Sequence, residues 1–186
     1  MRIISGKFKG RRLIAPKNLP VRPTTDMSKE SLFNILNNHF HFANLKVLDL
    51  FAGTGNISYE FGSRGCEDLT CVDANYSCIQ YIKKTAQELD LNITPIKSDV
   101  FPFLERHRGS YDVIFADPPY DMAEKDFHRL VELIFAQDLL DEQGVLVVEH
   151  SKHTPMKHLD YFSYDKNYGA SVFSFFEYPE IEEEEA

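Results

Sequence analysis

The chain has 186 residues, of which 43% are hydrophobic, and it carries a formal net charge of −9. This length predicts one globular domain with a substantial core and is too short for two. No apolar run approaches the ~18 residues of a membrane span, and the first residues, MRIISGKFKGRRL, lack the apolar segment of a signal peptide. We therefore expect a cytoplasmic protein with no membrane partner.

The charge is unevenly distributed along the chain. Residues 1–22 contain seven basic side chains and no acid, whereas residues 180–186 contain five glutamates. A basic arm on an acidic body is typical of a protein that contacts nucleic acid, but a solvated terminal hairpin explains it equally well. The basic residues of this arm are Arg2, Lys7, Lys9, Arg11, Arg12, Lys17 and Arg22.

The cysteines and histidines indicate neither a disulfide framework nor a metal site. Cys66, Cys71 and Cys78 are odd in number and lack C-x-x-C spacing, so we expect them to be buried small residues. The seven histidines form no H-E-x-x-H or comparable pattern. No metal is expected.

The N-terminal part predicts a hairpin and a helix attached to a larger unit. Residues 2–14 contain short β-like pieces separated by Gly6 and Gly10, and three prolines between residues 16 and 23 predict an extended connector. Thr24 or Thr25 can cap the following helix, whose apolar face includes residues 32–36. We therefore divide the chain into a basic arm (1–25), a main domain (26–179) and an acidic tail (180–186) that we expect to be disordered.

From residue 46 onward, apolar runs alternate with helical stretches. The predicted strands are 46–52, 68–74, 92–99, 112–118 and 144–151, and the predicted helices lie near 56–64, 76–90, 100–107 and 124–137. Continuous apolar strands, each followed by a helix, predict an α/β fold with a parallel sheet covered on both faces. Residues 161–178 have no helix-length spacer and predict a closing hairpin at the sheet edge.

The first strand of this unit leads into a glycine-containing loop, in the stretch VLDLFAGTGNIS (47–58). Gly53 and Gly55 permit positive φ and close approach of a ligand to the backbone, and the next helix presents its N-terminus there. Phe51 and Ser58 occupy the positions of the first and third glycines of the dinucleotide fingerprint. The loop therefore favours a nucleoside with a smaller tail over a dinucleotide.

Acidic residues follow three of the predicted strands. Ligands of open α/β sheets bind beyond the carboxyl ends of the strands. There, Asp73 can accept both hydroxyls of a ribose and Asp99 can accept an amino proton of adenine. Each acid alone could simply cap a helix, but three such acids beside a glycine loop, with Asp117 as the third, favour a ligand site.

The stretch FADPPYD (115–121) ends a buried strand with a rigid corner. Proline fixes φ and restricts the residue before it, so Pro118 and Pro119 stiffen the backbone around Asp117. An exocyclic amine of a nucleobase is a poor nucleophile, and two acceptors that hold both of its N–H bonds localise its lone pair. The Asp117 carboxylate and the Pro118 carbonyl can be these acceptors, with Tyr120 stacked on the base. The alternative is a cis-proline turn with a capping acid.

These motifs resemble known enzymes. The stretches VLDLFAGTGNIS, CVDAN, KSDV and DPPY look like those of S-adenosylmethionine-dependent methyltransferases that modify amino groups. The stretches RIISGKFKGRRL, RPTTDMSKESLFNIL and NYGASVFSFFEY are similar to those of bacterial 16S rRNA guanine-N2 methyltransferases of the RsmD type. The resemblance spans nearly the whole chain apart from the glutamate tail.

The resemblance implies a Rossmann-like class I methyltransferase fold: a seven-stranded, mostly parallel sheet of order 3-2-1-4-5-7-6 with the last strand antiparallel. It implies that the protein binds S-adenosylmethionine and acts on 16S rRNA, the small ribosomal subunit or an assembly intermediate. We expect a monomer, although the sequence does not fix the oligomeric state. The implied cofactor-binding residues are Asp49, Phe51, Gly53, Gly55, Asp73, Ala74, Asp99 and Val100. A flipped guanine is expected against Asp117, Pro118, Pro119 and Tyr120, and RNA phosphates against Arg2, Lys7, Lys9, Arg11, Arg12 and Arg22.

One residue departs from the family pattern. Met27 follows RPTTD, where such proteins often carry an arginine. If that arginine holds RNA, Lys29 or Arg22 could substitute for it. Two rival functions also remain at this stage: an adenine-N6 DNA methyltransferase, which shares DPPY but usually needs a separate target-recognition segment, and a non-catalytic nucleotide- or RNA-binding module.

Overall fold

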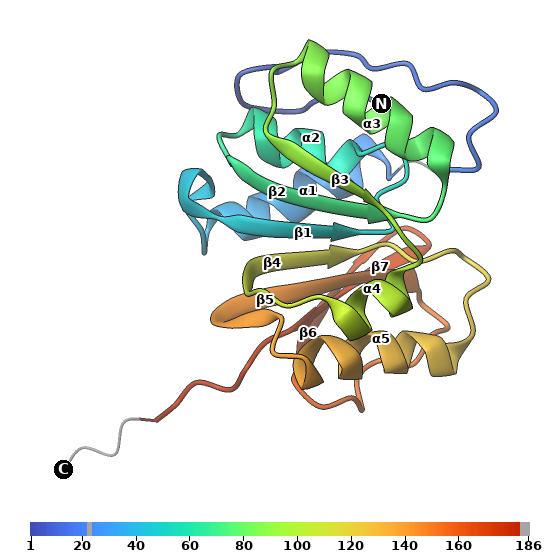
Figure 1. The fold of residues 1–186 in the computed structure, drawn as a ribbon. Helices are drawn as coiled ribbons and strands as arrows, with labels where there is room; N and C mark the ends of the chain where they lie inside the picture. Colours follow the sequence, from blue (N-terminus) through green and yellow to red (C-terminus); the bar gives the residue numbers. More distant parts are fainter. Residues whose placement is uncertain (22–23, 183–186) are drawn as a thin grey trace.

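The computed structural model describes residues 1–21 and 24–182 and contains one seven-stranded sheet flanked by helices (Figure 1). The elements in chain order are α1 (Asp26–Asn37), the 3-10 helix η1 (Phe42–Asn44), β1 (Lys46–Leu50), α2 (Asn56–Ser63), β2 (Asp68–Asp73), α3 (Tyr76–Glu88), β3 (Ile93–Lys97), α4 (Val100–Arg106), β4 (Tyr111–Ala116), α5 (Glu124–Ala136), β5 (Leu140–Ser151), β6 (Phe162–Tyr168) and β7 (Ser171–Phe176).

The strand order of the sheet is β3-β2-β1-β4-β5-β7-β6, as predicted. The first five strands are mutually parallel, and β7 runs antiparallel to both of its neighbours, β5 and β6. The carboxyl ends of β1 to β5 therefore meet at one edge of the sheet. The chain order reverses between β1 and β4, which is where ligands bind in open sheets of this kind.

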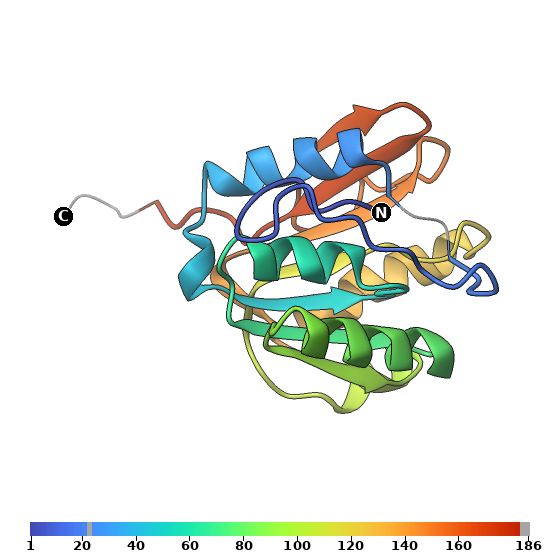
Figure 2. The ribbon, with the colours of Figure 1, turned by 90° about the horizontal axis from the view of Figure 1, so that it is seen from above.

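Helices cover both faces of the sheet. Successive strand residues point to opposite faces, so Val47, Phe115 and Val147 pack with α1 and α2, whereas Leu48 and Ile114 pack with α4 and α5. Helix α3 lies over β2 and β3 on the same face as α1 and α2, as seen from above in Figure 2. Two-sided burial explains why the strands are continuously apolar instead of alternating.

Some element boundaries differ from the predicted ones. Strand β5 begins at Leu140, four residues earlier than expected, because Leu140 already pairs with Tyr111 of β4; the regular register resumes at Val113 and Val145 after an irregularity. The N-terminal hairpin contains an isolated antiparallel bridge between Arg2 and Arg12 and no regular strands. Thr25 is the cap of α1, and its hydroxyl accepts a hydrogen bond from the Ser28 amide at 3.2 Å.

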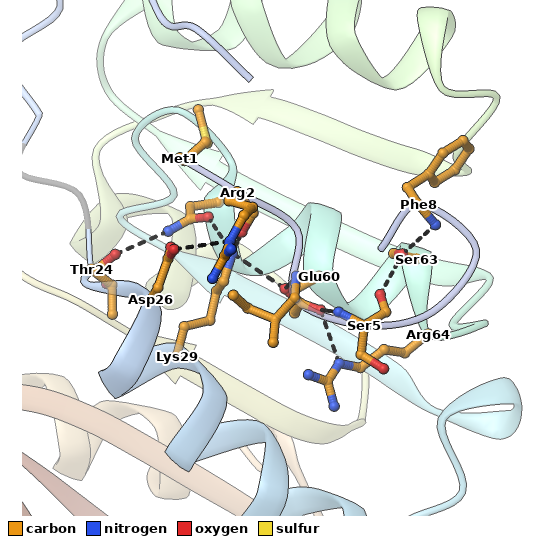
Figure 3. A network of polar contacts seen from close by, with 12 residues as sticks. Met1, Arg2, Ser5, Phe8, Thr24, Asp26, Lys29, Glu60, Ser63 and Arg64 are labelled. Carbon is orange, nitrogen blue, oxygen red and sulfur yellow. Dashed lines mark hydrogen bonds and ion pairs between the residues drawn. The ribbon is translucent and has the colours of Figure 1, made fainter. Parts of the chain in front are cut away.

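The N-terminal segment is fixed to α1 and α2 by a buried ionic network, drawn in Figure 3. Lys29 and Glu60 have fully buried side chains and form an ion pair at 3.2 Å. The Glu60 carboxylate also accepts the amides of Ile4 at 2.8 Å and Ser5 at 3.1 Å, and it pairs with Arg64. The segment is therefore held in place by charge-assisted hydrogen bonds, which are stronger than neutral ones.

Close backbone packing continues this attachment. The amide of Lys7 donates to the carbonyl of Ser63 at 2.7 Å, and the Ser63 hydroxyl donates to the carbonyl of Ser5 at 2.7 Å. Gly6 has φ +86°, and a Cβ at this position would lie 1.9 Å from the Ser63 carbonyl oxygen. Glycine is thus required at the point where the segment crosses the C-terminal end of α2.

Within the described part of the chain, no helix is both long and apolar enough to cross a bilayer. Nor do the histidine, cysteine, aspartate and glutamate side chains of that part gather into a group that could hold a metal ion.

Candidate active site

A cavity of about 1100 Å³ opens at the carboxyl edge of the sheet. Its walls come from the connector before α1, the first turn of α1, the β1–α2 loop, the ends of β2, β4 and β5, and the β6–β7 turn. Most of the predicted site residues line it: Asp49, Phe51, Gly53, Asp73, Ala74, Asp99, Val100, Asp117, Pro118, Pro119 and Tyr120.

The β1–α2 loop is shaped by left-handed backbone conformations and held by Asp73. Phe51 and Gly53 have φ of 57° and 56°. One carboxylate oxygen of Asp73 accepts the amide of Gly53 at 2.9 Å, and the other accepts the amide of Asn75 at 2.8 Å. A carboxylate has about four acceptor sites, so these two bonds leave Asp73 with capacity for ligand hydroxyls.

Gly55, predicted to bind the cofactor, is the last residue of this loop and does not line the cavity. It is the N-cap of α2, with φ 85° and ψ 14°. A Cβ at this position would approach the Tyr59 ring to 2.7 Å, so both the left-handed conformation and the space require glycine. Its observed role is to turn the chain from β1 into α2.

Asp49 is an ionisable group buried at the floor of the cavity. It is 2% exposed, and its carboxylate accepts the hydroxyl of Ser58 at 2.7 Å. Burial raises the pKa of Asp49 to about 7; the Ser58 hydrogen bond opposes this shift, and the nearby Asp73 adds to it. The group therefore titrates near neutral pH.

Asp99 and Val100 form the part of the cavity wall that follows β3. Asp99 is exposed and occupies the N-cap position of α4, but its side chain makes no capping hydrogen bond. Its observed conformation does not match the simple helix-cap explanation. Val100 is buried beneath it.

The Asp117–Tyr120 corner, which follows β4, lines the same cavity as Asp73. Asp117 is half-buried and Pro118 is buried, whereas Pro119 is exposed and Tyr120 is 79% exposed. The carbonyl of Pro119 accepts the amide of Met122 at 3.0 Å, which closes a turn after the corner. The described residues contain no cis peptide bond, so the cis-proline alternative is wrong.

The wall beside this corner contains residues that the sequence reasoning missed. They come from the end of β5, the β6–β7 turn and the start of α1: Glu149, His150, Ser151, Asn167, Tyr168, Gly169, Ala170, Ser171, Thr24, Thr25, Met27 and Ser28. His150 is held between the Ser151 carbonyl at 2.7 Å and the Ser174 hydroxyl at 2.6 Å, and burial lowers its pKa. The stretch VVEHS offered a signal, because it places an acid, Glu149, near the end of the strand that follows the DPPY strand.

The basic arm exposes most of its charge. The side chains of Lys7, Lys9, Arg11 and Arg12 lie at the surface, and Arg2 forms a 3.2 Å ion pair with Asp26. Arg22, another predicted RNA contact, lies outside the described residues.

The suggestion that Lys29 replaces the arginine missing at position 27 is wrong, because Lys29 is fully buried. Its amino group donates to Asn56 Oδ1 at 2.9 Å and pairs with Glu60, and burial lowers its pKa. Met27 itself is 76% exposed at the rim of the cavity.

The three cysteines are buried and unpaired, as expected. Burial raises the pKa of the Cys66 and Cys78 thiols to about 11, so neither is a thiolate at neutral pH. None of the three lines the cavity.

The sheet order and the position of the cavity define a class I methyltransferase fold. A solved structure titled "Putative methyltransferase yhhF from Escherichia coli" superposes with a TM-score of 0.85 at 23% identity, covering 97% of this chain and 99% of that one. Magnesium protoporphyrin IX methyltransferase from Synechocystis, solved with bound S-adenosylmethionine, gives a TM-score of 0.65 at 15% identity, covering 82% and 79%.

Sequence relatives narrow the class to a family. The "Putative rRNA methyltransferase YlbH" of Bacillus subtilis is 36% identical over 161 residues, 84% of this chain and 85% of that protein. Ribosomal RNA small subunit methyltransferase D of Buchnera aphidicola subsp. Baizongia pistaciae is 37% identical over 152 residues, 80% and 75%. The family model described as conserved hypothetical protein 95 matches residues 1–177, and the chain belongs to this family. The predicted resemblance is confirmed.

Proposed function

We propose that this protein transfers a methyl group from S-adenosylmethionine to the exocyclic N2 amine of one guanine in 16S rRNA. The observation that carries the proposal is that a single cavity is lined by both the nucleoside-binding loop and the Asp117–Tyr120 corner. The names of the sequence relatives support rRNA as the substrate, and the name of the Buchnera relative supports rRNA of the small subunit. An electrophile and its nucleophile must meet within one site for direct transfer.

The residues of the cavity fit the proposed cofactor. Asp73 and Asp99 can accept hydrogen bonds from ribose hydroxyls and from an adenine amine, and the loop at Gly53 brings backbone close to the ligand. Phe51, Ala74 and Val100 supply apolar contacts, and the buried Asp49 carboxyl lies at the floor. When bound, S-adenosylmethionine supplies a methyl group activated by its sulfonium.

The Asp117–Tyr120 corner makes the guanine amine a better nucleophile. The Asp117 carboxylate and the Pro118 carbonyl accept the two N–H bonds of guanine N2, so that the lone pair is localised and directed at the methyl carbon. The exposed Tyr120 ring stacks on the flipped base. One N–C bond forms as one C–S bond breaks, and the proton that the methylated amine releases passes to Asp117 or to water. No cysteine is needed, consistent with their positions outside the cavity.

The arm supplies affinity for RNA. Exposed Lys7, Lys9, Arg11 and Arg12 can neutralise phosphates without reading sequence, and Arg2 and Arg22 complete the proposed set. Because the arm is fixed to α2, it can hold RNA in one orientation relative to the cavity. We place the protein in the cytoplasm, as a monomer, acting on the small subunit or on an assembly intermediate.

Methyl incorporation from labelled cofactor tests the proposal. Small-subunit particles from cells that lack this gene should accept about one methyl group per particle, at guanine N2 by mass mapping, and duplex DNA should accept none. Incorporation into adenine N6 of DNA would favour the rival enzyme. No heat of binding with S-adenosylmethionine in calorimetry would favour a non-catalytic module.

A further inference from the structure

Glu149 is a second carboxylate beside the corner. The parallel pairing of β4 with β5 places Ala116 opposite Val148, so Asp117 and Glu149 are the next residues along two adjacent strands. Phe115 and Val147, one step before that pair, belong to the hydrophobic cluster beneath α1. Because side chains alternate between faces, Asp117 and Glu149 emerge on this same face. Both line the cavity.

The Glu149 side chain is oriented by a chain of hydrogen bonds. The Thr24 hydroxyl donates to Glu149 Oε2 at 3.4 Å. The Thr24 carbonyl accepts from the side-chain amide of Asn56 at 3.4 Å, and Asn56 accepts from the buried Lys29 at 2.9 Å. The carboxylate is thus linked to the network that fixes the N-terminal segment, which is drawn in Figure 3 as far as Thr24. A carboxylate has about four acceptor sites on its two oxygens, so it can accept a ligand donor in addition to protein donors.

Guanine and adenine differ at the atom that such a carboxylate would meet. In guanine, N1 carries a proton and adjoins the carbon that bears the N2 amine. In adenine, N1 is an acceptor with a lone pair. An ionised carboxylate only accepts hydrogen bonds, so it binds the N1–H of guanine and repels the N1 lone pair of adenine.

We propose that Glu149 accepts the N1–H of the target guanine while Asp117 and Pro118 hold its N2 amine. Glu149 is then a specificity-determining residue that rejects any base without a proton at N1. This assignment rests on the proposed function, because it uses the position of the amine at the corner. Such a contact explains how a DPPY corner, which adenine-N6 DNA methyltransferases share, can serve guanine.

The experiment uses RNA with 2-aminopurine at the mapped target position. This base keeps the exocyclic 2-amine, the methyl acceptor, but its N1 carries no proton. Single-turnover methylation of guanine and 2-aminopurine RNA is compared for the wild type, Glu149→Gln and Glu149→Asp. Glu142→Gln, at an exposed β5 position that does not line the cavity, is the matched control. 2-Aminopurine also lacks O6, but this loss is the same for every enzyme compared.

The wild type and Glu142→Gln should methylate guanine at least about 100-fold faster than 2-aminopurine, because a buried hydrogen-bonding site strongly rejects a ligand that lacks the matching group. Glu149→Gln should lose about 10- to 100-fold on guanine, and its preference should fall toward unity, because the amide can donate to N1. Glu149→Asp remains acceptor-only and should still reject 2-aminopurine. Cofactor affinity should be unchanged in all variants.

An unchanged guanine preference in Glu149→Gln would overturn the assignment. If that variant does not fold, a Glu149→Asp enzyme that accepts both bases equally would overturn it as well. A wild type that methylates no guanine N2 would instead refute the proposed function, so the two failures are distinguishable.

Discussion

The buried Asp49 carboxyl makes the stability of the fold depend on pH. Its pKa rises from 3.8 in the unfolded chain to about 7 in the folded protein, so the folded state binds the proton more tightly. The stabilising contribution of this proton is complete below pH 4 and is lost as pH rises through about 7. A shift of this size corresponds to about 4 kcal/mol, of which about 2–3 kcal/mol is lost between pH 5 and pH 8.

Asp49→Asn removes this titration and keeps an oxygen that can accept the Ser58 hydroxyl. We expect the variant to gain about 2–3 kcal/mol relative to the wild type between pH 5 and pH 8. Urea unfolding at each pH measures the difference, and thermal unfolding should show about 2–4 °C for each kcal/mol. Contributions from ionisable groups that do not interact with Asp49 cancel in the comparison.

Parallel stability curves for the two proteins would refute this reasoning, because they would show that Asp49 does not titrate near pH 7. Since Asp49 also lines the proposed cofactor site, cofactor must be omitted from these measurements.

Three further predictions concern the arm, the loop and the buried network. Reversing the charge of Arg11 and Arg12 should weaken RNA binding and flatten its salt dependence without changing cofactor affinity. The control Lys125→Glu on α5 should leave both RNA and cofactor affinity unchanged, and unchanged RNA affinity in the arm variant would favour the solvated-hairpin explanation. Asp73→Ala should weaken S-adenosylmethionine binding in calorimetry, because it removes a ligand acceptor and the 2.9 Å support of the loop; wild-type affinity would contradict this role. Glu60→Gln should destabilise the fold by roughly 3–5 kcal/mol in urea unfolding, because it leaves the buried Lys29 with a weaker partner. Hydrogen exchange in the N-terminal segment should become faster; unchanged exchange would show that other contacts hold the segment.

Much of the sheet could be predicted because its signals are local. The five parallel strands appear as continuous apolar runs bounded by helix-length spacers, and Gly53 and Pro118 mark the turns at their ends. The strand order came from the family resemblance, since apolar runs alone do not specify which strands pair. Strand β5 was predicted too short, because residues 141–143 resemble a turn but lie within the strand, at the irregularity between the Tyr111–Leu140 and Val113–Val145 pairs.

The missed features depend on contacts between distant residues. Glu60 has the sequence appearance of an ordinary helix residue, and its burial against Lys29 follows only when α1, α2 and the N-terminal segment come together. Similarly, Thr24 and Glu149 are 125 positions apart and meet only because α1 begins over the end of β5. Gly55 stays a predicted cofactor residue; the structure shows that it turns the backbone into α2, and a glycine with that role and a glycine that admits a ligand look alike in sequence.

The most direct test of the account is single-turnover methylation of its RNA substrate by Asp117→Ala, combined with cofactor calorimetry on the same preparation. In the proposed mechanism Asp117 contributes an acceptor to the amine, and it does not belong to the proposed cofactor-binding set. We predict that the variant binds S-adenosylmethionine as the wild type does and loses about 10²–10³-fold or more in methyl transfer. Methylation at the wild-type rate would contradict the proposed role of the proline-stiffened corner.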